Sequence, residues 1–407
     1  MKQDLDHLME QRDLDAILVA GKIHGNPAMY YLTNGAGLVG GRVLKKRGEK
    51  AVLLCSPIER EEALASGLSV VNTNKYDFRD ILREKKDRLA AVVELHRRII
   101  VDLDVSGKVG FYGMMDRGSA WTLLNTLNSQ LEGIEVYGEF GVTLIDVARA
   151  TKETAEAERI REMGRRTCDV IGQTIEFLKS HRVKEETLVQ PDGAPLTIRR
   201  VRQEINRYIA EQQMEDPEGF IFAIGRDAGI PHNKGCPEDT ISLGKTIVFD
   251  IFPCEAGGGY YADVTRTFCL GYAPPEVEKV YQDVYECQTK MIEAYQVGAK
   301  AQHYQEMTCD FFEDRGHPTV ASDSRTEAGY VHSLGHGLGL AIHEEPRFSG
   351  APTNTDVLKP GHIFTCEPGL YYPDRGFGVR IEDDIWIDSD GGIHNLTDFP
   401  KELVIEL

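Results

Sequence analysis

The sequence predicts two domains, an open α/β domain followed by a region of helices and then strands joined by glycine-rich turns. Its 407 residues are more than one ordinary hydrophobic core accommodates. Up to about residue 150, short apolar runs alternate with helical segments, whereas strands prevail from Gly219 onward. We place the boundary between residues 145 and 152, which gives domains of residues 1–148 and 149–407.

The first domain contains a polar helix followed by short apolar runs, which we interpret as strands separated by helices. The runs cover residues 15–20, 29–37, 51–57, 98–104 and 109–113, and the last leads into a helical stretch at 119–131. This alternation is typical of an open α/β sheet. No glycine fingerprint opens any of the helices, so a dinucleotide site is not supported.

The second domain is expected to begin with two helices. Thr151 is a candidate N-cap for a long helix with apolar residues at 3.6-residue spacing. These apolar residues are Ile160, Met163, Ile171, Ile175 and Leu178. A second helix, at about 198–212, follows the turn sequence QPDGAP.

Composition narrows the class of function. The chain has 65 acidic and 46 basic residues, a net charge of −19, so a general affinity for nucleic acid or an anionic membrane is not expected. No apolar run approaches the roughly 20 residues that span a bilayer, and the N-terminal residues are too polar for a secretory signal. We therefore expect a cytoplasmic protein. The eight cysteines form no CxxC pair, so we interpret them as small buried side chains.

Four carboxylates in the second domain lie within or beside apolar strands. They are Asp250 in TIVFDIFP, Asp263 after a glycine turn, Glu367 after HIFTC, and Glu382 in GVRIEDDIWI. The last segment, residues 378–387, predicts one strand whose alternation places Arg380, Glu382 and Asp384 on one face and Asp383 on the other. Four converging carboxylates repel one another and are costly to bury without a cation. A metal site would remove that conflict.

Histidines supply a candidate nitrogen ligand. His332, His336 and His343 lie in HSLGHGLGLAIHEEP, and His232 lies in GIPHNKG. A single histidine is more often structural, but three within twelve residues favour a functional site. One imidazole with four carboxylates suits two divalent ions such as Mn, Co or Zn. Three other kinds of site are not supported by the sequence. GHGLGL lacks the Lys-Ser/Thr of a phosphate-binding loop, and HEEP does not match the HExxH motif of zinc peptidases. DSDGG lacks the ligand pattern of a calcium loop and predicts a hairpin turn.

Four segments resemble, in order, the signatures of the pita-bread metallopeptidases, the group of methionine aminopeptidase, aminopeptidase P, prolidase and creatinase. They are DVTRTF (263–268), HSLGHGLGLAIHEEP (332–346), CEPGLYY (366–372) and GVRIEDD (378–384). The resemblance spans about residues 150–407 and implies an α+β pita-bread catalytic domain. The first domain contains DAILVAGKIHGNPAMYYLTNGAG, which resembles the creatinase-type N-terminal domain of prolidase and aminopeptidase P. Methionine aminopeptidases usually lack that domain.

The resemblance implies a role for each matching residue. Asp250 binds one metal, His336 and Glu367 hold the second, and Asp263 and Glu382 bridge the two. His232, His332 and His343 line the substrate site, and Arg380 belongs to its polar network. The sequence departs from the family pattern after Asp250, because the gap to Asp263 is two residues longer than usual and Phe252 replaces a common glycine. Glycines 257–259 are expected to absorb the extra length.

The expected function is hydrolysis of the Xaa-Pro bond of a small peptide by a homodimer with two divalent ions per subunit, manganese being the expected metal. A metal-bridging hydroxide would attack the scissile carbonyl while His343 stabilises the oxyanion. Glu367 would pass a proton to the leaving nitrogen. His232 and His332 are candidate walls of the proline niche, and His232 is also a candidate catalytic residue.

Two questions stay open from the sequence. A dipeptidase and an aminopeptidase both fit, with a slight preference for the dipeptidase. A creatinase-like hydrolase that works without metal, or a binding protein without activity, would also share the fold, although all five ligand types are present in order.

Overall fold

The computed structural model describes residues 4–407, which divide into two compact units. The first unit comprises the residues up to Arg149 together with Gly257–Gly259, and the second comprises Ala150–Ala256 and Tyr260–Leu407. Within residues 4–407, no helix combines the length and the apolar character needed to cross a lipid bilayer.

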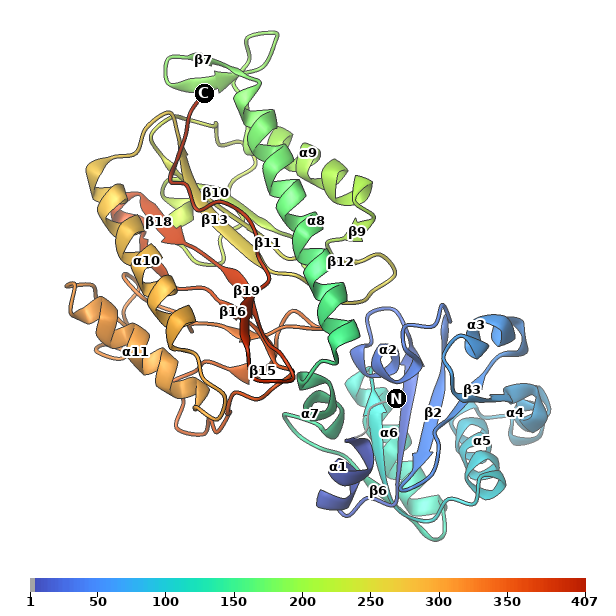
Figure 1. The fold of residues 1–407 in the computed structure, drawn as a ribbon. Helices are drawn as coiled ribbons and strands as arrows, with labels where there is room; N and C mark the ends of the chain where they lie inside the picture. Colours follow the sequence, from blue (N-terminus) through green and yellow to red (C-terminus); the bar gives the residue numbers. More distant parts are fainter. Residues whose placement is uncertain (1–3) are drawn as a thin grey trace. The chain divides into compact units, whose positions relative to one another are not determined.

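A six-stranded mixed sheet forms the centre of the first unit, in the order β4-β3-β2-β1-β5-β6 (Figure 1). Its strands are β1 (Ala16–Lys22), β2 (Gly40–Lys46), β3 (Val52–Cys55), β4 (Ser69–Asn72), β5 (Gly107–Gly113) and β6 (Ile134–Tyr137). The central strand β1 pairs antiparallel with β2 and parallel with β5. The other strand pairs include two parallel ones, β3 with β4 and β5 with β6.

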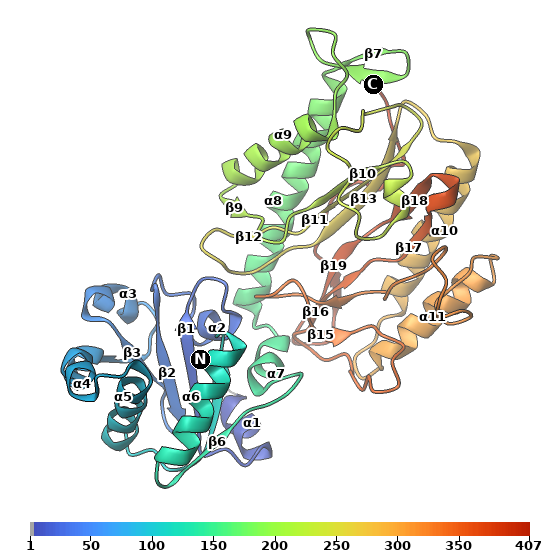
Figure 2. The same cartoon turned by 180° about the vertical axis from the view of Figure 1, so that it is seen from behind.

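Helices complete the first unit. They are α1 (Leu5–Gln11), α2 (Pro27–Thr33), α3 (Arg60–Leu64), α4 (Phe78–Lys85), α5 (Arg88–Asp102), α6 (Arg117–Gln130) and α7 (Leu144–Ala150). Apolar side chains of α5 and α6 share one core with those of β1, β2, β3 and β5. Figure 2 shows α6 in front of the strands. The α/β class predicted for the N-terminal part is therefore confirmed.

Two of the apolar runs predicted as strands are helical instead. Residues 29–37 lie largely in α2, where Pro27 occupies the first turn and the Asn26 side chain accepts a hydrogen bond from the backbone of Met29. Residues 98–102 form the end of α5 and residues 103 and 104 the turn after it, and the buried Leu95 and Ile99 lie one helical turn apart. The sequence pattern missed β2, because GGRVLKK contains two glycines and three basic side chains.

The second unit begins with a long helix that starts slightly later than predicted. Helix α8 (Thr154–Lys179) is capped by Glu153, which exchanges hydrogen bonds with the first turn through Glu156. Thr151 is therefore not the N-cap, and it forms an isolated β-bridge with His362. The predicted apolar face packs into the core of the unit. Helix α9 (Ile198–Glu211) matches the second predicted helix.

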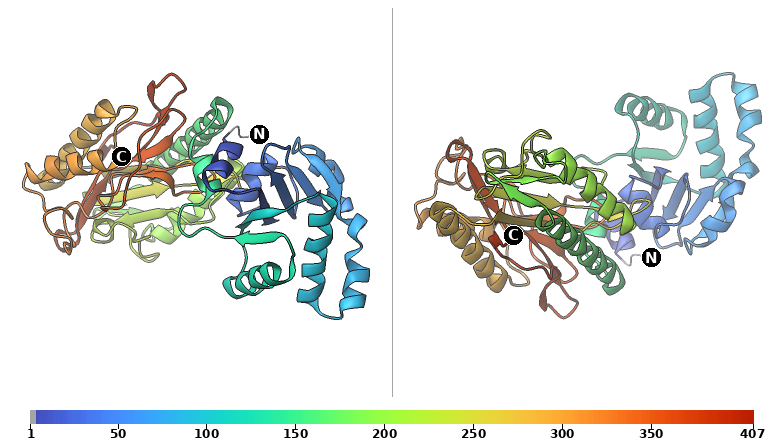
Figure 3. Two further views of the ribbon diagram at one scale, coloured as in Figure 1. Left: turned by 90° about the horizontal axis from the view of Figure 1, so that it is seen from below. Right: turned by 90° about the horizontal axis from the view of Figure 1, so that it is seen from above.

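Two sheets and a hairpin lie between two pairs of helices in the second unit (Figure 1, Figure 3). One sheet has the order β10-β11-β13-β21 and shares a core with α8 and α9. The other has the order β15-β14-β16-β19-β20, and its core includes α10 (Pro275–Ala294) and α11 (Ala301–Glu313). The strands are β10 (Ile221–Ile224), β11 (Thr246–Ile251), β13 (Val264–Leu270), β14 (His336–Gly337), β15 (Glu344–Arg347), β16 (Ile363–Cys366), β17 (Gly369–Tyr372), β18 (Phe377–Arg380), β19 (Asp383–Ile387), β20 (Ile393–Asn395) and β21 (Val404–Ile405).

The strand predicted at 378–387 is broken in two. Strand β18 pairs with β17, whereas β19 pairs with β16 in the five-stranded sheet. Ile381 and Glu382 connect them, and the backbone N–H of Glu382 donates to the carbonyl of Thr265 at 3.1 Å. The break occurs because the two halves join different partners. The break leaves Glu382 between two strands, where the alternation of a strand does not fix the direction of its side chain.

Three smaller predictions have clear outcomes. Strands β19 and β20 pair with Ile387 opposite Ile393, so the hairpin turn at DSDGG is confirmed. All eight cysteines are free and seven are buried, but Cys236 is exposed. Between Asp250 and Asp263 lies a short strand, β12 (Cys254–Glu255), which pairs with β9 (Met214–Glu215), and Gly257 and Gly258 follow it with positive φ. The small hairpin β7 (Arg182–Lys184) and β8 (Thr187–Val189) completes the unit.

Candidate active site

Two antiparallel strand pairs bring the four predicted acidic ligands together. Asp250 lies in β11 opposite Thr265 of β13, and Asp263 immediately precedes β13. Glu367 immediately follows β16, and Glu382 immediately precedes its partner β19. In an antiparallel pair the end of one strand lies beside the start of the next, so each pair presents two acids at one edge.

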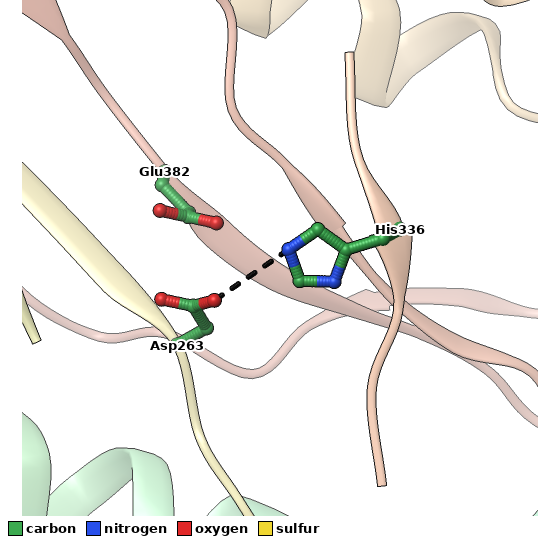
Figure 4. A group of neighbouring side chains, drawn as sticks. All are labelled: Asp263, His336 and Glu382. Atoms are coloured by element: carbon green, nitrogen blue, oxygen red, sulfur yellow. Dashed lines mark ion pairs between the residues drawn. The ribbon is translucent and has the colours of Figure 1, made fainter. Parts of the chain in front are cut away.

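His336 joins these acids from β14, and Figure 4 shows its ring facing Asp263 and Glu382. Its Nε2 atom lies 3.7 Å from Oδ2 of Asp263 and 3.4 Å from Oε1 of Glu367. One ligand atom each of Asp263, His336 and Glu382 lies within 4.8 Å of the others. The hydroxyl of Thr365 accepts the backbone N–H of His336 at 3.2 Å and lies 3.4 Å from Glu367, which holds the two in register.

Carboxylate oxygens in this cluster lack donors. Oδ1 of Asp250, Oδ1 of Asp263 and Oε1 of Glu382 are buried and accept no hydrogen bond from residues 4–407. Burial and neighbouring carboxylates raise the pKa of Asp263 and of Glu382 well above their usual range, and burial raises the pKa of Glu367 to about 8. Buried acceptors without donors cost free energy, which bound cations offset. The donor set therefore fits divalent metal ions.

Arg380 compensates part of the negative charge. Its guanidinium donates to Asp250 Oδ2, to the hydroxyl of Tyr371 at 2.7 Å and to Oγ1 of Thr265 at 3.1 Å. The hydroxyl of Thr265 in turn donates to Oε2 of Glu382 at 2.6 Å. Arg380 therefore orients Asp250 directly and Glu382 through Thr265. A planar guanidinium with several fixed donors suits this task, which a lysine ammonium could not perform.

His332 and His343 are held toward their neutral forms by their surroundings. Nδ1 of His332 lies 2.6 Å from a backbone carbonyl oxygen and must carry the proton, so Nε2 accepts from the hydroxyl of Tyr371 at 3.0 Å. Burial lowers the pKa of His332 to about 3. The ring of His343 packs edge to face on His336 with centroids 4.4 Å apart, and burial lowers its pKa as well.

All nine predicted site residues line one pocket of about 690 Å³ in the second unit. They are Asp250, Asp263, His336, Glu367, Glu382, His232, His332, His343 and Arg380. Phe252, Lys234 and Arg347 also line it, so the pocket combines an acidic centre with an aromatic side chain and two cations. A pocket of this size accommodates a small molecule or a short peptide.

Sequence reasoning missed the groups that position these side chains. Tyr371 lies within CEPGLYY and joins Arg380 to His332, but nothing in its spacing indicates that role. Asp383 is buried and accepts hydrogen bonds from Arg266 at 2.9 Å and Lys401 at 2.6 Å. Its predicted position on the face opposite to Glu382 is the one signal that separates this structural acid from the cluster.

A buried ion pair lies immediately after His343. Nζ of Lys152 lies 2.7 Å from Oε2 of Glu344, and the two side chains are 1% and 2% exposed. The other carboxylate oxygen of Glu344 accepts the backbone N–H of Ala341 at 3.1 Å. The pair joins the start of the second unit to the segment that carries His343, at a sequence separation that no local pattern reveals.

An α+β unit with a buried carboxylate and imidazole cluster in a pocket has the features of a metal-dependent hydrolase. Residues 158–389 match the model of metallopeptidase family M24, so the chain belongs to that family. The Bacillus subtilis relative YkvY is 35% identical over 193 residues, which cover 46% of this chain and 48% of that protein. The Xaa-Pro dipeptidase of Pyrococcus furiosus is 26% identical over 408 residues, 99% of this chain and 100% of that protein.

A solved structure supports the fold. The Xaa-Pro dipeptidase from Bacillus anthracis superposes with a TM-score of 0.76 at 24% identity, covering 100% of this chain and 98% of that one. The predicted fold class, an α/β N-terminal domain followed by a pita-bread catalytic domain, is thereby confirmed. The protein is a metallopeptidase.

Proposed function

We propose that this protein is an Xaa-Pro dipeptidase that uses two divalent metal ions. The observation that carries the proposal is the set of buried, unpartnered oxygens on Asp250, Asp263 and Glu382, three residues that line a pocket of the size of a short peptide. The full-length similarity to the Pyrococcus furiosus protein named Xaa-Pro dipeptidase supports the substrate class.

Five side chains would hold the ions. Asp250, Asp263, His336, Glu367 and Glu382 would be the ligands, with Asp263 and Glu382 between the other three. Four carboxylates with one imidazole are hard or borderline ligands, which suits Mn, Co or Zn, and we propose manganese. When bound, the ions would supply Lewis acidity that activates water at neutral pH and polarises the substrate carbonyl.

Three residues of the chain would handle the proton and the developing charge. Glu367 accepts a proton from the attacking water and delivers it to the leaving nitrogen, a role that needs a carboxyl group in this buried position. His343 donates a hydrogen bond to the oxyanion of the tetrahedral intermediate. Arg380 holds Asp250 in place throughout, because their contact is buried and charge-assisted.

The proline ring requires flat walls that follow its shape, and its nitrogen needs no hydrogen-bond acceptor, because that nitrogen carries no hydrogen in the substrate. His332 is a rigid wall, since both of its ring nitrogens have partners. His232 and Phe252 line the same pocket and supply flat surfaces. Substrate discrimination would therefore depend on shape at the second residue.

A dipeptide ends in a free carboxylate directly after proline. Lys234 and Arg347 line the pocket and can pair with that carboxylate. A longer peptide would have a neutral amide at the same place and would lose this attraction. This charge arrangement favours a dipeptidase over an aminopeptidase.

One panel of substrates tests the proposal. Ala-Pro, Ala-Pro-Ala, Met-Ala-Ser and creatine are each incubated with protein reconstituted with Mn, Co or Zn, and products are measured by chromatography. We expect cleavage of Ala-Pro with Mn and at least about tenfold slower cleavage of Ala-Pro-Ala, because the longer peptide loses the ion pair with Lys234 or Arg347. Equal rates on the two peptides identify an aminopeptidase instead. Turnover of creatine by metal-free protein contradicts the metal mechanism.

We also propose a cytoplasmic homodimer, on the basis of the resemblance of the first domain to that of prolidase. Light scattering of the full chain measures the mass directly, and a value near 45.5 kDa would contradict the dimer.

A further inference from the structure

The first unit contains a pocket of its own, with a volume of about 480 Å³. It lies between the six-stranded sheet and the two helices that cover one face of it. Arg42 of β2 and Phe111 of β5 line it from the sheet, and His96 of α5 and Leu123 of α6 line it from the helices. All of its lining residues belong to the first unit, so it is separate from the pocket that holds the metal ligands.

Arg42 is a cation without an acid in this pocket. Its Nε atom is closed to solvent and donates no hydrogen bond, and within residues 4–407 no carboxylate pairs with the guanidinium. Arg42 as a whole is half-buried, whereas the two fully buried arginines of the second unit have acidic partners, Arg266 with Asp383 and Arg380 with Asp250. Burial lowers the pKa of Arg42, which records the cost of desolvating the charge. A partly desolvated charge without an acidic partner costs free energy, which a bound anion would offset.

The other walls add no positive charge. Burial, followed in size by the charge of Arg42, lowers the pKa of His96 to about 4, so His96 is neutral at pH 7. Its Nδ1 atom already lies 2.7 Å from the carbonyl oxygen of Val92. Met114 and Met115 line the pocket while remaining 66% and 57% exposed, so flexible apolar side chains lie at its rim.

We propose that this pocket binds a small monocarboxylate, with the carboxylate on the guanidinium of Arg42 and an apolar body against Phe111, Leu123 and Met114. A single planar guanidinium matches the two oxygens of one carboxylate. Phosphate is a poorer match, since phosphate sites usually offer several donors or a helix N-terminus. The site is independent of peptide hydrolysis, and it gives the first domain a ligand of its own.

Calorimetric titration of the full-length protein with phenylacetate tests the site. We expect one phenylacetate per chain, and at least about tenfold weaker binding of the neutral isostere phenylacetamide, because the charge-assisted pair is lost. Inorganic phosphate, at the same concentrations, should not compete. Displacement of phenylacetate by phosphate would overturn the assignment to a carboxylate.

Variants locate the binding. Arg42→Met should abolish phenylacetate binding, and Arg42→Lys should weaken it, because the ammonium cannot form the two parallel hydrogen bonds. Lys46→Met is the matched control, since Lys46 lies on the same strand, pairs with Glu49 and does not line the pocket. Unchanged phenylacetate affinity in Arg42→Met would overturn the proposal.

The thermal midpoint of the ligand-free protein gives a second, independent readout. Arg42→Met removes an unpaired, partly desolvated charge and should raise the midpoint by about 2 °C or more, while removing the stabilisation by phenylacetate. A lower midpoint would show that Arg42 already has a stabilising partner and would contradict the proposal. The comparison of phenylacetate with phenylacetamide on the unmodified protein decides the question even if a variant does not fold.

Discussion

The backbone N–H of Asp263 donates a hydrogen bond of 3.1 Å to Oδ2 of Asp384. Asp384 thus supports a proposed metal ligand on another strand, and its own backbone is held by the hydroxyl of Thr397 at 2.9 Å. The two acids at 382 and 384 therefore differ in role, since Glu382 offers a free oxygen to the cluster and Asp384 positions Asp263.

Asp384→Asn and Asp384→Ala separate these roles. The amide oxygen of Asn can still accept from Asp263, so we expect Asp384→Asn to retain its metal ions. Asp384→Ala loses the acceptor and should weaken metal affinity by about tenfold or more, the usual effect of removing a group that orients a ligand. Metal titration followed by atomic emission measures both, with Asp390→Asn on the exposed hairpin as control. Full metal affinity in Asp384→Ala would contradict the positioning role.

Glu382→Gln should abolish metal binding and turnover while the fold is kept. In the presence of a chelator the same variant should be more stable than the unmodified protein by on the order of 1 kcal/mol, because one of the crowded buried carboxyl groups no longer has to bind a proton or carry a charge. Urea unfolding with and without chelator measures both effects. A loss of stability in chelator would assign Glu382 a structural role, and undiminished turnover would exclude it as a ligand.

His343→Ala should lower kcat by about 10²–10³-fold, the usual effect of losing one oxyanion donor. Its thermal midpoint should stay within about 2 °C, because the ring lies at the pocket and not in the core. His303→Ala, on the exposed side of α11, is the matched control. If kcat is retained while the midpoint falls, His343 serves the fold and not the reaction.

Lys152→Met should lower the free energy of unfolding by about 3 kcal/mol, because Glu344 keeps a buried charge without its partner. Adding Glu344→Gln should restore most of the loss, since Gln is neutral and can still accept the N–H of Ala341. Urea unfolding measures the three proteins. Lys179→Met, which removes an exposed pair with Glu176, is the control and should change stability by less than about 0.5 kcal/mol. Additive losses in the double variant would contradict coupling between the two side chains.

His96 should make the first unit sensitive to acid. Burial lowers its pKa to about 4 from a usual value near 6.5, so the unfolded chain binds the proton more readily. The contribution of neutral His96 to the free energy of unfolding is therefore fully present above pH 6.5. It is lost as the pH falls from 6.5 toward 4, and the total loss is on the order of 3 kcal/mol. His96→Gln should flatten this slope and His7→Gln should not. Urea unfolding at pH 7 and pH 5, followed by Trp121 fluorescence in a Trp386→Phe background, measures the difference. Equal slopes with and without His96 would contradict the prediction.

The local spacing of apolar residues predicted much of the fold correctly. It did not predict those strands whose bounds depend on the strands they pair with. The long apolar spacing of α8 and the turn before α9 were readable, because a helix satisfies its own backbone. Residues 29–37 and 98–104 are apolar runs too short for periodicity to distinguish a strand from a helix. The predicted strand 378–387 failed for another reason, since only the neighbouring strands decide where it divides.

The sequence by itself determined the set of candidate site residues in the second unit. Its ordered motifs contain four carboxylates and four histidines, and all the predicted site residues line one pocket. Their metal-binding and catalytic roles stay predictions. These residues are recognisable because each lies at a strand end or in a glycine-rich segment close to its motif neighbours.

Only the tertiary structure decided which atoms are left without partners. The contacts of Asp384 with Asp263 and of Lys152 with Glu344 join residues more than 100 positions apart, and no periodicity encodes such pairs. The tertiary structure likewise decided that Arg42 has no acidic partner, which the sequence does not reveal. A charged side chain indicates a binding site only when the fold shields it from water and supplies no partner of opposite charge. Both conditions depend on the surrounding chain, and so on the tertiary structure.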